Sequence, residues 1–378
     1  MEINHKNLGV LLEKSFEVKK PLFIWGGTGI GKSVTSKDIF KKIAKENGRD
    51  FLEWNKISDK EKIELKDNDE LRKKVFIFAD VRMSQMDSTD FKGIPKLDAA
   101  DYCEWKPPLL FRVLASDGCM AGVFMDEFNT APPSVQASAM QLILDREIGE
   151  LALAEDVFLI AAGNRGAEDK SATFDIPGPL LNRFGHCELQ VPTAEDWTAW
   201  ALKNGIDERI IGFINFAESH LWKWDPDNKD KAFSTPRRLN DLSAYIKDEK
   251  NLDLVRLYAT ANIGAGSATE FVKFVEIGMK LNLDDFLKNP KKLEKLIKMD
   301  VKYALLSSAI ERYRKKPKIL EAITEFTHYV QPEFAIYLLK MLRGTDDAMG
   351  RDYFKANIKK VKSFQKLCNN FGRFIVSE

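Results

Sequence analysis

The fold is decided by the stretch Gly26-Gly27-Thr28-Gly29-Ile30-Gly31-Lys32-Ser33. It fits the pattern GxxxxGK[ST] without a mismatch and stands between an apolar run, residues 21–25, and an amphipathic stretch, residues 32–45. In such a loop the backbone N–H groups surround a β-phosphate, the lysine reaches the β- and γ-phosphates, and the serine hydroxyl binds Mg²⁺. The stretch predicts a nucleotide-binding P-loop; a glycine-rich turn without a ligand is the alternative.

Short apolar runs alternate with amphipathic stretches over the first 190 residues. Besides residues 21–25, such runs lie at residues 75–79, 122–125, 157–162 and 187–191. Runs of this length are typical of strands buried on both faces, and helical patterns lie between them. The predicted fold class is therefore α/β, with a P-loop parallel sheet that carries helices on both faces.

After Pro192 the pattern becomes helical. We predict three domains: residues 1–191 as the nucleotide-binding α/β domain, residues 192–262 as an α-helical lid, and residues 263–378 as a basic helical region. Two capping boxes, Thr193 with Asp196 and Ser267 with Glu270, are expected to open helices. Two charged insertions interrupt the first domain: residues 47–74, interpreted as a solvated surface segment, and residues 89–106, with Phe91, Tyr102 and Trp105 suited to partner contact or to burial.

Composition limits the class of protein. The chain has 378 residues, of which 44% are hydrophobic and 30% charged, as in globular proteins with two or three modules. No apolar run is long enough to span a membrane, and residues 1–20 carry charges where a signal peptide needs apolar residues. We expect a soluble, cytoplasmic protein without a membrane partner. The four scattered cysteines favour core thiols over disulfides or a zinc site.

Two acids follow the third apolar run. Asp126 and Glu127 stand where a Walker B motif places its carboxylates. Asp126 would hold Mg²⁺ through water, and Glu127 would orient and deprotonate the attacking water. A solvated start of a helix is the alternative interpretation.

Three further signals are individually weak. Asn164 follows the run at residues 157–162 and could reach a γ-phosphate or the attacking water, although a turn-forming Asn has the same signature. Arg183 follows a Pro/Gly stretch just before the last apolar run, and Arg237 lies at the start of a helix in the later region.

In chain order, these signals resemble the AAA+ ATPases over about residues 8–262. Two stretches are similar to the MoxR type, in the dynein-related subgroup: Asp126-Glu127-Phe128-Asn129-Thr130-Ala131-Pro132-Pro133 and Asp90-Phe91-Lys92-Gly93-Ile94-Pro95. The stretch Leu181-Asn182-Arg183-Phe184 resembles the family's arginine-finger motif.

The resemblance implies a role for each matching residue. It makes Lys32 and Ser33 the Walker A pair and Asp126 and Glu127 the Walker B pair. It also implies that Asn164 is sensor 1, that Arg183 is a finger acting on a neighbouring subunit, and that Arg237 is a nucleotide-contacting sensor 2. Arg165 stays an alternative to Arg183, and Arg238 an alternative to Arg237.

The function implied by the resemblance is that of a ring-forming ATPase, with a hexamer as the expected assembly. Mg-ATP hydrolysis would remodel or activate a protein client, possibly a von Willebrand factor A domain protein. A nucleic-acid motor or restriction-type translocase, which could use GTP, is the alternative. A scaffold that binds nucleotide without hydrolysis is disfavoured by Glu127.

The charge distribution bears on the nucleic-acid alternative. Residues 288–378 contain 20 Lys and Arg against 10 Asp and Glu, and the densest basic run spans residues 312–318. A phosphate backbone would suit that run. Apolar residues at helical spacing instead favour packing: Leu305, Ile310, Phe334, Ile336, Leu339 and Leu342. On that interpretation, changing Arg314, Lys315 and Lys316 to Glu should leave turnover and assembly intact.

Overall fold

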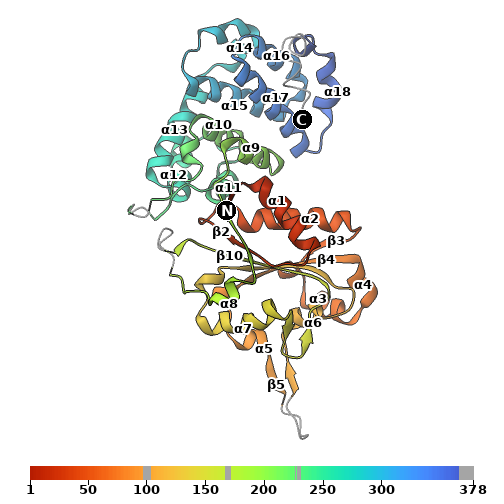
Figure 1. Cartoon of the computed structure of the whole chain (residues 1–378). Helices are drawn as coiled ribbons and strands as arrows, with labels where there is room; N and C mark the ends of the chain where they lie inside the picture. The colour runs from red at the N-terminus through yellow and green to blue at the C-terminus, as the bar shows by residue number, and fades with distance from the viewer. Residues whose placement is uncertain (97–103, 167–171, 226, 228–230, 366–378) are drawn as a thin grey trace. The chain divides into compact units, whose positions relative to one another are not determined.

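The computed structural model describes residues 1–96, 104–166, 172–225, 227 and 231–365. The chain divides into two compact units, Met1–Val191 and Pro192–Glu378. The first unit spans the residues predicted as the α/β domain, and the described part of the second consists of helices and their connections (Figure 1). Each unit is described by itself.

Seven parallel strands form one sheet in the first unit. Their order across the sheet is β1 (Glu2–Ile3), β11 (Gly185–Leu189), β2 (Leu22–Trp25), β10 (Asp156–Gly163), β7 (Met120–Asp126), β4 (Val75–Arg82) and β3 (Asp50–Glu53). In the register, Trp25 lies opposite Gly163, Ala161 opposite Met125, and Asp126 opposite Arg82. The carboxyl ends of β2, β10, β7 and β4 therefore meet at one edge. All five predicted runs are strands of this sheet, and the predicted fold class is confirmed.

Helices cover both faces of the sheet. Figure 1 shows α1 (His5–Glu17) and α2 (Lys32–Glu46) on one face, with α6 (Leu109–Leu114) and α7 (Pro133–Leu144) on the other. The Phe40 ring of α2 packs 5.5 Å from the Phe76 ring of β4. A Cβ at Gly122 would lie 2.7 Å from the Phe40 ring, so the glycine allows this helix to approach the sheet. Shorter helices complete the unit: α3 (Asp59–Asp67), α4 (Asp69–Lys74), α5 (Thr89–Lys92) and α8 (Gly178–Leu181).

The charged insertion at residues 47–74 is more than a solvated surface segment, and that interpretation is wrong. It contains the edge strand β3, which pairs with β4, and the helices α3 and α4. Trp54 and Leu65 are buried in the core on one face of the sheet. The strand escaped recognition because an edge strand is half solvated, and Asp50 and Glu53 flank only two apolar residues.

The second insertion forms α5 and a hairpin of β5 (Ile94–Lys96) and β6 (Glu104–Lys106). Phe91 is buried, and its ring lies 5.7 Å from that of Phe111. Trp105 is 50% exposed. Burial is thus confirmed for Phe91, partner contact of the exposed Trp105 stays a prediction, and Tyr102 lies outside the described residues.

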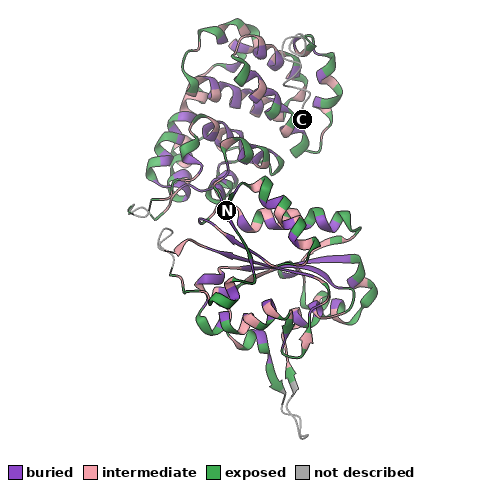
Figure 2. Cartoon of the chain, in the orientation of Figure 1, coloured by how far each residue is buried: buried purple, intermediate pink, exposed green. Residues whose placement is uncertain are grey.

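One hydrophobic core joins the helices of the second unit. It runs from Trp197 to Val361 and includes residues on both sides of the predicted boundary at residue 262, among them Ala259 and Phe271. Figure 2 shows these helices with buried and exposed residues on opposite faces. The helices are α9 (Ala194–Lys203), α10 (Glu208–Phe216), α11 (Pro236–Ile246), α12 (Leu252–Ile263), α13 (Ala265–Lys280), α14 (Leu283–Lys288), α15 (Met299–Lys315), α16 (Leu320–Thr324), α17 (Pro332–Ala348) and α18 (Tyr353–Asn357). The division into a lid and a C-terminal region stays a prediction.

The apolar positions expected to face the core are buried, except Ile336, which is half-buried. Thr193 caps α9, because its side chain accepts a hydrogen bond from the Asp196 N–H. The second expected capping box is wrong: α13 begins at Ala265. Ser267 and Glu270 instead contact His220, at 2.9 Å from its Nδ1 and 3.0 Å from its Nε2. Within the part of the chain that is described, no helix is both long and apolar enough to cross a membrane.

Candidate functional site

The glycine-rich loop connects the interior strand β2 to the N-terminus of α2. Gly26, Gly29 and Gly31 all have positive φ, at 152°, 75° and 104°. Gly31 is the N-cap residue of α2, and no side chain caps this described helix end. Because the first-turn N–H groups of a helix lack partners within the helix, this uncapped end can bind an anion.

Gly26 also gives the loop its close approach to the neighbouring strand. A Cβ there would lie 2.7 Å from Ile30 Cδ1 and 2.8 Å from the Leu189 carbonyl oxygen. Since both distances are shorter than any van der Waals contact, position 26 accepts only glycine without a shift of the backbone. The loop is thus shaped by its backbone, as a phosphate cradle requires.

Lys32 is buried inside this loop, with 9% of its surface exposed. Its Nζ donates hydrogen bonds to the Gly26 carbonyl at 2.6 Å, to the Gly27 carbonyl at 3.0 Å and to Asn164 Oδ1 at 3.2 Å. The ammonium is therefore held against the loop, and it touches the end of β10. A buried ammonium gains strongly from an anionic partner, so the arrangement favours phosphate binding.

The acids predicted as Walker B lie at the end of β7. The Glu127 N–H donates to Asp126 Oδ1 at 2.9 Å. Glu127 adopts a left-handed backbone conformation, with φ 56° and ψ 36°, which is unfavourable for a non-glycine residue. Its Oε2 accepts a hydrogen bond from the Ser84 hydroxyl, in the turn η2 (Met83–Gln85) that follows β4. The carboxylate is thus held by the neighbouring strand's turn.

The buried side-chain amide of Asn129 connects the segments that follow β7 and β10. Asn129 is 4% exposed. Its Nδ2 donates to the Asn164 carbonyl at 2.9 Å, and its Oδ1 accepts from the Asn164 N–H at 3.2 Å. Because these bonds fix the backbone of Asn164, its side chain is left to contact Lys32.

Sequence reasoning assigned no role to Ser84 or Asn129. Asn129 stood inside the MoxR-like stretch, so its position in that stretch was the available signal. Ser84 lies two residues after β4, whose carboxyl end meets the P-loop edge. The signal for Ser84 was therefore the strand order, which the sequence did not contain.

A cavity of about 650 Å³ extends from the first turn of α2 over the ends of β3 and β4. Such volumes are typical of ligand sites. Its polar lining consists of Ser33, Lys37, Glu53, Asn55, Lys56, Asp80, Arg82 and Gln85. Ser33 lines this cavity, whereas Asp126, the last residue of β7, does not; hydroxyl and carboxylate oxygens are ligands of the kind that Mg²⁺ prefers. Among the described residues no group of three or more His, Cys, Asp and Glu could hold a metal ion. Two protein ligands suit Mg²⁺, which keeps waters and substrate phosphates in its shell.

The two candidate finger arginines lie at opposite edges of the sheet. Arg165 follows β10 at the carboxyl edge, with Nη1 3.8 Å from Glu188 Oε1. Arg183 is exposed and precedes β11, whose first residue pairs with Leu22 at the start of β2. The structure thus places Lys32, Ser33, Asp126, Glu127 and Asn164 at the carboxyl edge and Arg183 at the amino edge.

Arg237 belongs to the second unit. It is exposed in the first turn of α11, which Thr235 caps by accepting a hydrogen bond from the Arg238 N–H at 3.1 Å. Arg238 is paired with Asp241 at 3.4 Å. The sensor 2 role of Arg237 stays a prediction.

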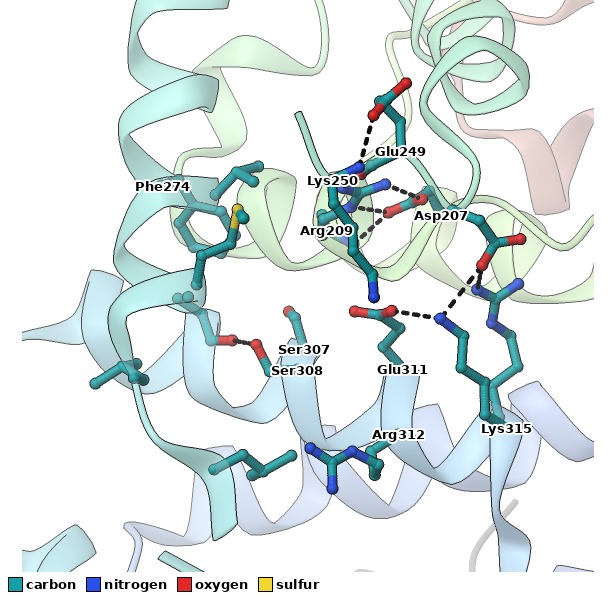
Figure 3. A pocket seen from close by; sticks show the side chains of 18 of the residues that line it. Asp207, Arg209, Glu249, Lys250, Phe274, Ser307, Ser308, Glu311, Arg312 and Lys315 are labelled. Carbon is teal, nitrogen blue, oxygen red and sulfur yellow. Dashed lines mark hydrogen bonds and ion pairs between the residues drawn. The ribbon is translucent and has the colours of Figure 1, made fainter. Parts of the chain in front are cut away.

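The basic run of the second unit is paired with acids. Arg312 lies 2.9 Å from Asp284, Arg314 lies 3.0 Å from Glu208, and Lys315 lies 2.9 Å from Glu311. Figure 3 shows Lys315 and Glu311 pointing toward each other on the wall of a cavity of about 540 Å³. Burial, together with the nearby Asp207, raises the pKa of Glu208 to about 7, against the opposing effect of Arg314. Arg312, Arg314 and Lys315 of this run are thus paired within the unit, whereas Lys316 and Lys318 have no ion pair among the described residues.

Comparison with known proteins gives distant similarities. No family model matches the chain, and no curated protein sequence matches it. NtrX from Brucella abortus in complex with ADP is 16% identical at a TM-score of 0.37, over 95% of this chain and 68% of that one. The Thermotoga maritima RuvB Holliday junction branch migration motor is 14% identical at 0.31, over 96% and 86%. PCH-2 of C. elegans is 14% identical at 0.31, over 71% and 66%. The fold described above rests on the strand order and register of the chain itself.

Proposed function

We propose that the chain is an AAA+ nucleoside triphosphatase that binds ATP with Mg²⁺ at residues 26–33 and hydrolyses it. One observation carries the proposal. Lys32, at the uncapped N-terminus of α2, contacts Asn164 at the end of β10, and Glu127 follows the neighbouring strand β7 at the same edge of the sheet. Phosphate-binding, polarising and proton-accepting groups are thus collected where ligands bind in parallel sheets.

Each residue has a chemical task in this proposal. Lys32 and the first N–H groups of α2 balance the negative charge of the phosphates. Ser33 and Asp126 would hold Mg²⁺, which supplies further positive charge to the reacting phosphate oxygens. Glu127 accepts the proton of the attacking water, and Asn164 orients that water or the γ-phosphate.

The Ser84 hydroxyl is bonded to the carboxylate that must accept this proton. The bond holds the carboxylate toward the η2 turn, so Glu127 has to leave Ser84 before it can turn to an attacking water. A movement of the η2 turn that takes Ser84 away from Glu127 would therefore link ATP hydrolysis to the conformation of the carboxyl edge of the sheet.

At the finer level we propose a MoxR-type ring, with a hexamer as the expected size, in which Arg183 acts on the nucleotide of a neighbour. The position of Arg183 at the amino edge supports action between subunits. We propose that this ring remodels a protein client, and a von Willebrand factor A domain protein is one candidate. The nucleic-acid alternative is disfavoured because Arg312, Arg314 and Lys315 of the basic run are paired with acids.

The test combines two variants with matched controls. Lys32→Ala should weaken ATP binding by about 100-fold or more, since a buried charge-assisted contact is lost. Glu127→Gln should bind ATP and hydrolyse it at a small fraction of the normal rate. Lys60→Ala and Glu64→Gln, on the exposed face of α3, should change neither property.

Wild-type ATP affinity in folded Lys32→Ala protein would reject the P-loop assignment, and wild-type turnover in Glu127→Gln would reject the base. The Glu127→Gln protein, loaded with ATP, also serves to capture the client from a lysate. Mass spectrometry of the captured proteins, compared with a Lys32→Ala capture, separates clients of the ATP state from background.

A further inference from the structure

A small cavity of about 130 Å³ lies at the amino edge of the first unit's sheet. Four of its lining residues are cations and none is an acid: Lys19, Lys20, Arg146 and Arg183. The rest of the lining is Pro21, Ile143, Leu144 and Leu159. Asp156, outside this lining, is paired with Lys19, so the net positive charge of the site comes mainly from the other three cations. Such a concave site attracts anions, and its apolar walls strengthen that attraction.

Two of these cations stand at helix ends where glycine is usual. Lys19 follows α1 with φ 54°, and its N–H donates to the Phe16 carbonyl at 3.3 Å. The Lys20 N–H donates to the Ser15 carbonyl at 3.1 Å, which completes a Schellman motif. Arg146 follows α7 with φ 60°. Left-handed backbone is unfavourable for both residues, and such outliers gather at functional sites.

The four cations divide into a fixed pair and a free pair. Lys19 is paired with Asp156 at 2.7 Å, and Arg146 Nη2 donates to the Ala154 and Val157 carbonyls at 2.9 and 2.8 Å. Burial lowers the pKa of Arg146, against the opposing effect of the nearby Glu155 and Asp156. Lys20 and Arg183 are exposed, and neither side chain has a hydrogen bond or ion pair with the described residues.

The chain's own P-loop cannot supply the anion. Pro21 and Gly26 lie before and after β2, so the cavity and the loop are about 16 Å apart along the strand, at 3.3 Å per residue. The cavity is compact enough for one phosphate group, whereas a nucleic-acid backbone calls for an extended basic stripe. A second copy of the chain would present such a phosphate at the open end of its P-loop.

We propose that Lys20 acts with Arg183 in this cavity to bind the terminal phosphates of a nucleotide held by a second copy of the chain. Lys19 and Arg146 form its positively charged wall. This inference rests on the proposed function and extends it, because it adds Lys20 to the contact between subunits and defines the cavity that receives the phosphate.

The experiment uses the full chain with Mg-ATP, at concentrations that give assembly. Lys20→Ala should lower turnover by roughly tenfold or more, as for loss of one donor to a transition-state anion. Its ATP affinity should stay within about twofold of the wild type. Lys20→Arg should recover most of the turnover, and Lys60→Ala should match the wild type in both measurements.

Mixed assemblies decide which nucleotide Lys20 contacts. Copies with Lys20→Ala bind ATP but lack the lysine at position 20. Copies with Lys32→Ala bind ATP poorly but carry an intact Lys20. Mixing the two should raise turnover above the sum of the separate proteins, since the second copy supplies the missing lysine. A mixture without that gain would assign Lys20 to its own subunit's nucleotide and overturn the proposal.

Three other outcomes would also overturn it. One is a turnover of Lys20→Ala equal to that of Lys60→Ala. Another is the absence of ATP-dependent association in sedimentation. The third is a salt-sensitive DNA or RNA complex lost in Lys20→Ala, because the anion would then be a polymer. Normal results for Lys32→Ala and Glu127→Gln, as stated above, would instead reject the proposed function.

Discussion

Two regions of the molecule carry dense positive charge, and they use it differently. In the second unit, the basic run at residues 312–318 lies against acids, and Arg314 contacts the buried Glu208. At the amino edge of the first unit, Lys20 and Arg183 line a cavity and have no ion pair with the described residues. The run that stood out in the sequence is thus mostly engaged in ion pairs, whereas the site proposed for an anion uses the two unpaired cations. Pairing in three dimensions decides the role, not the local count of charges.

The largest expected effect comes from Arg183→Ala. An arginine acting on a neighbour's γ-phosphate contributes about 10³ or more to the rate, so turnover should fall by that factor while ATP affinity stays unchanged. Steady-state hydrolysis and nucleotide titration measure the two quantities. If Arg183→Ala kept its turnover, or if turnover did not fall on dilution below the assembly threshold, Arg183 would not act on a neighbour's nucleotide. The two cationic regions would then not differ in this respect.

Arg314→Glu should lower the free energy of unfolding by about 3 kcal/mol, because it places a carboxylate beside the buried Glu208 and next to Asp248. Urea denaturation measures this loss. The expectation that changing residues 314–316 to Glu leaves turnover and assembly intact stays a prediction, and this loss of stability is a separate property of position 314. Lys316→Glu is the matched control, since Lys316 is exposed and has no ion pair with the described residues. Equal stability of the two variants would contradict the structural role of Arg314.

Glu208 should make the stability of the second unit depend on pH. Its folded pKa of about 7 lies above the ordinary value of 4.5, so the protonated form favours the folded state. This contribution is complete below pH 4.5 and is lost as pH rises through 7, by about 3 kcal/mol. Urea denaturation of wild type and Glu208→Gln at pH 5 and pH 8 tests it. The free energy of unfolding should fall more steeply with pH in the wild type than in Glu208→Gln. Equal dependence on pH in the two proteins would exclude Glu208 as the source of the effect.

The smallest expected effect concerns the carboxyl edge, where Glu127 is held by Ser84. Ser84→Ala should raise single-turnover hydrolysis by about fivefold, since one hydrogen bond of about 1 kcal/mol no longer restrains the base. ATP affinity should be unchanged, because Ser84 makes no other contribution to the loop. Slower hydrolysis in Ser84→Ala would show that the hydroxyl orients Glu127 for the reaction instead of restraining it.

Much of the first unit could be predicted because its signals are local. Five apolar runs became five strands, and the glycine pattern fell between β2 and α2 as expected. The edge strands β1 and β3 were missed, since two to four half-exposed residues produce no hydrophobic pattern. Ser267 and Glu270 were taken for a helix cap because their spacing fits one, while the structure uses both to bind His220.

The sequence by itself determined the parallel sheet, the glycine-rich loop between β2 and α2, and the two acids at the end of β7. These depend on hydrophobic runs, on glycines that allow positive φ, and on residues adjacent in the chain. Only the tertiary structure decided which strands are neighbours, and with that the bonds from Lys32 to Asn164 and from Ser84 to Glu127. It also decided which cations are paired. Partners 43 to 132 residues apart in the chain leave no periodic trace in the sequence, because their contact is created by strand order and packing alone.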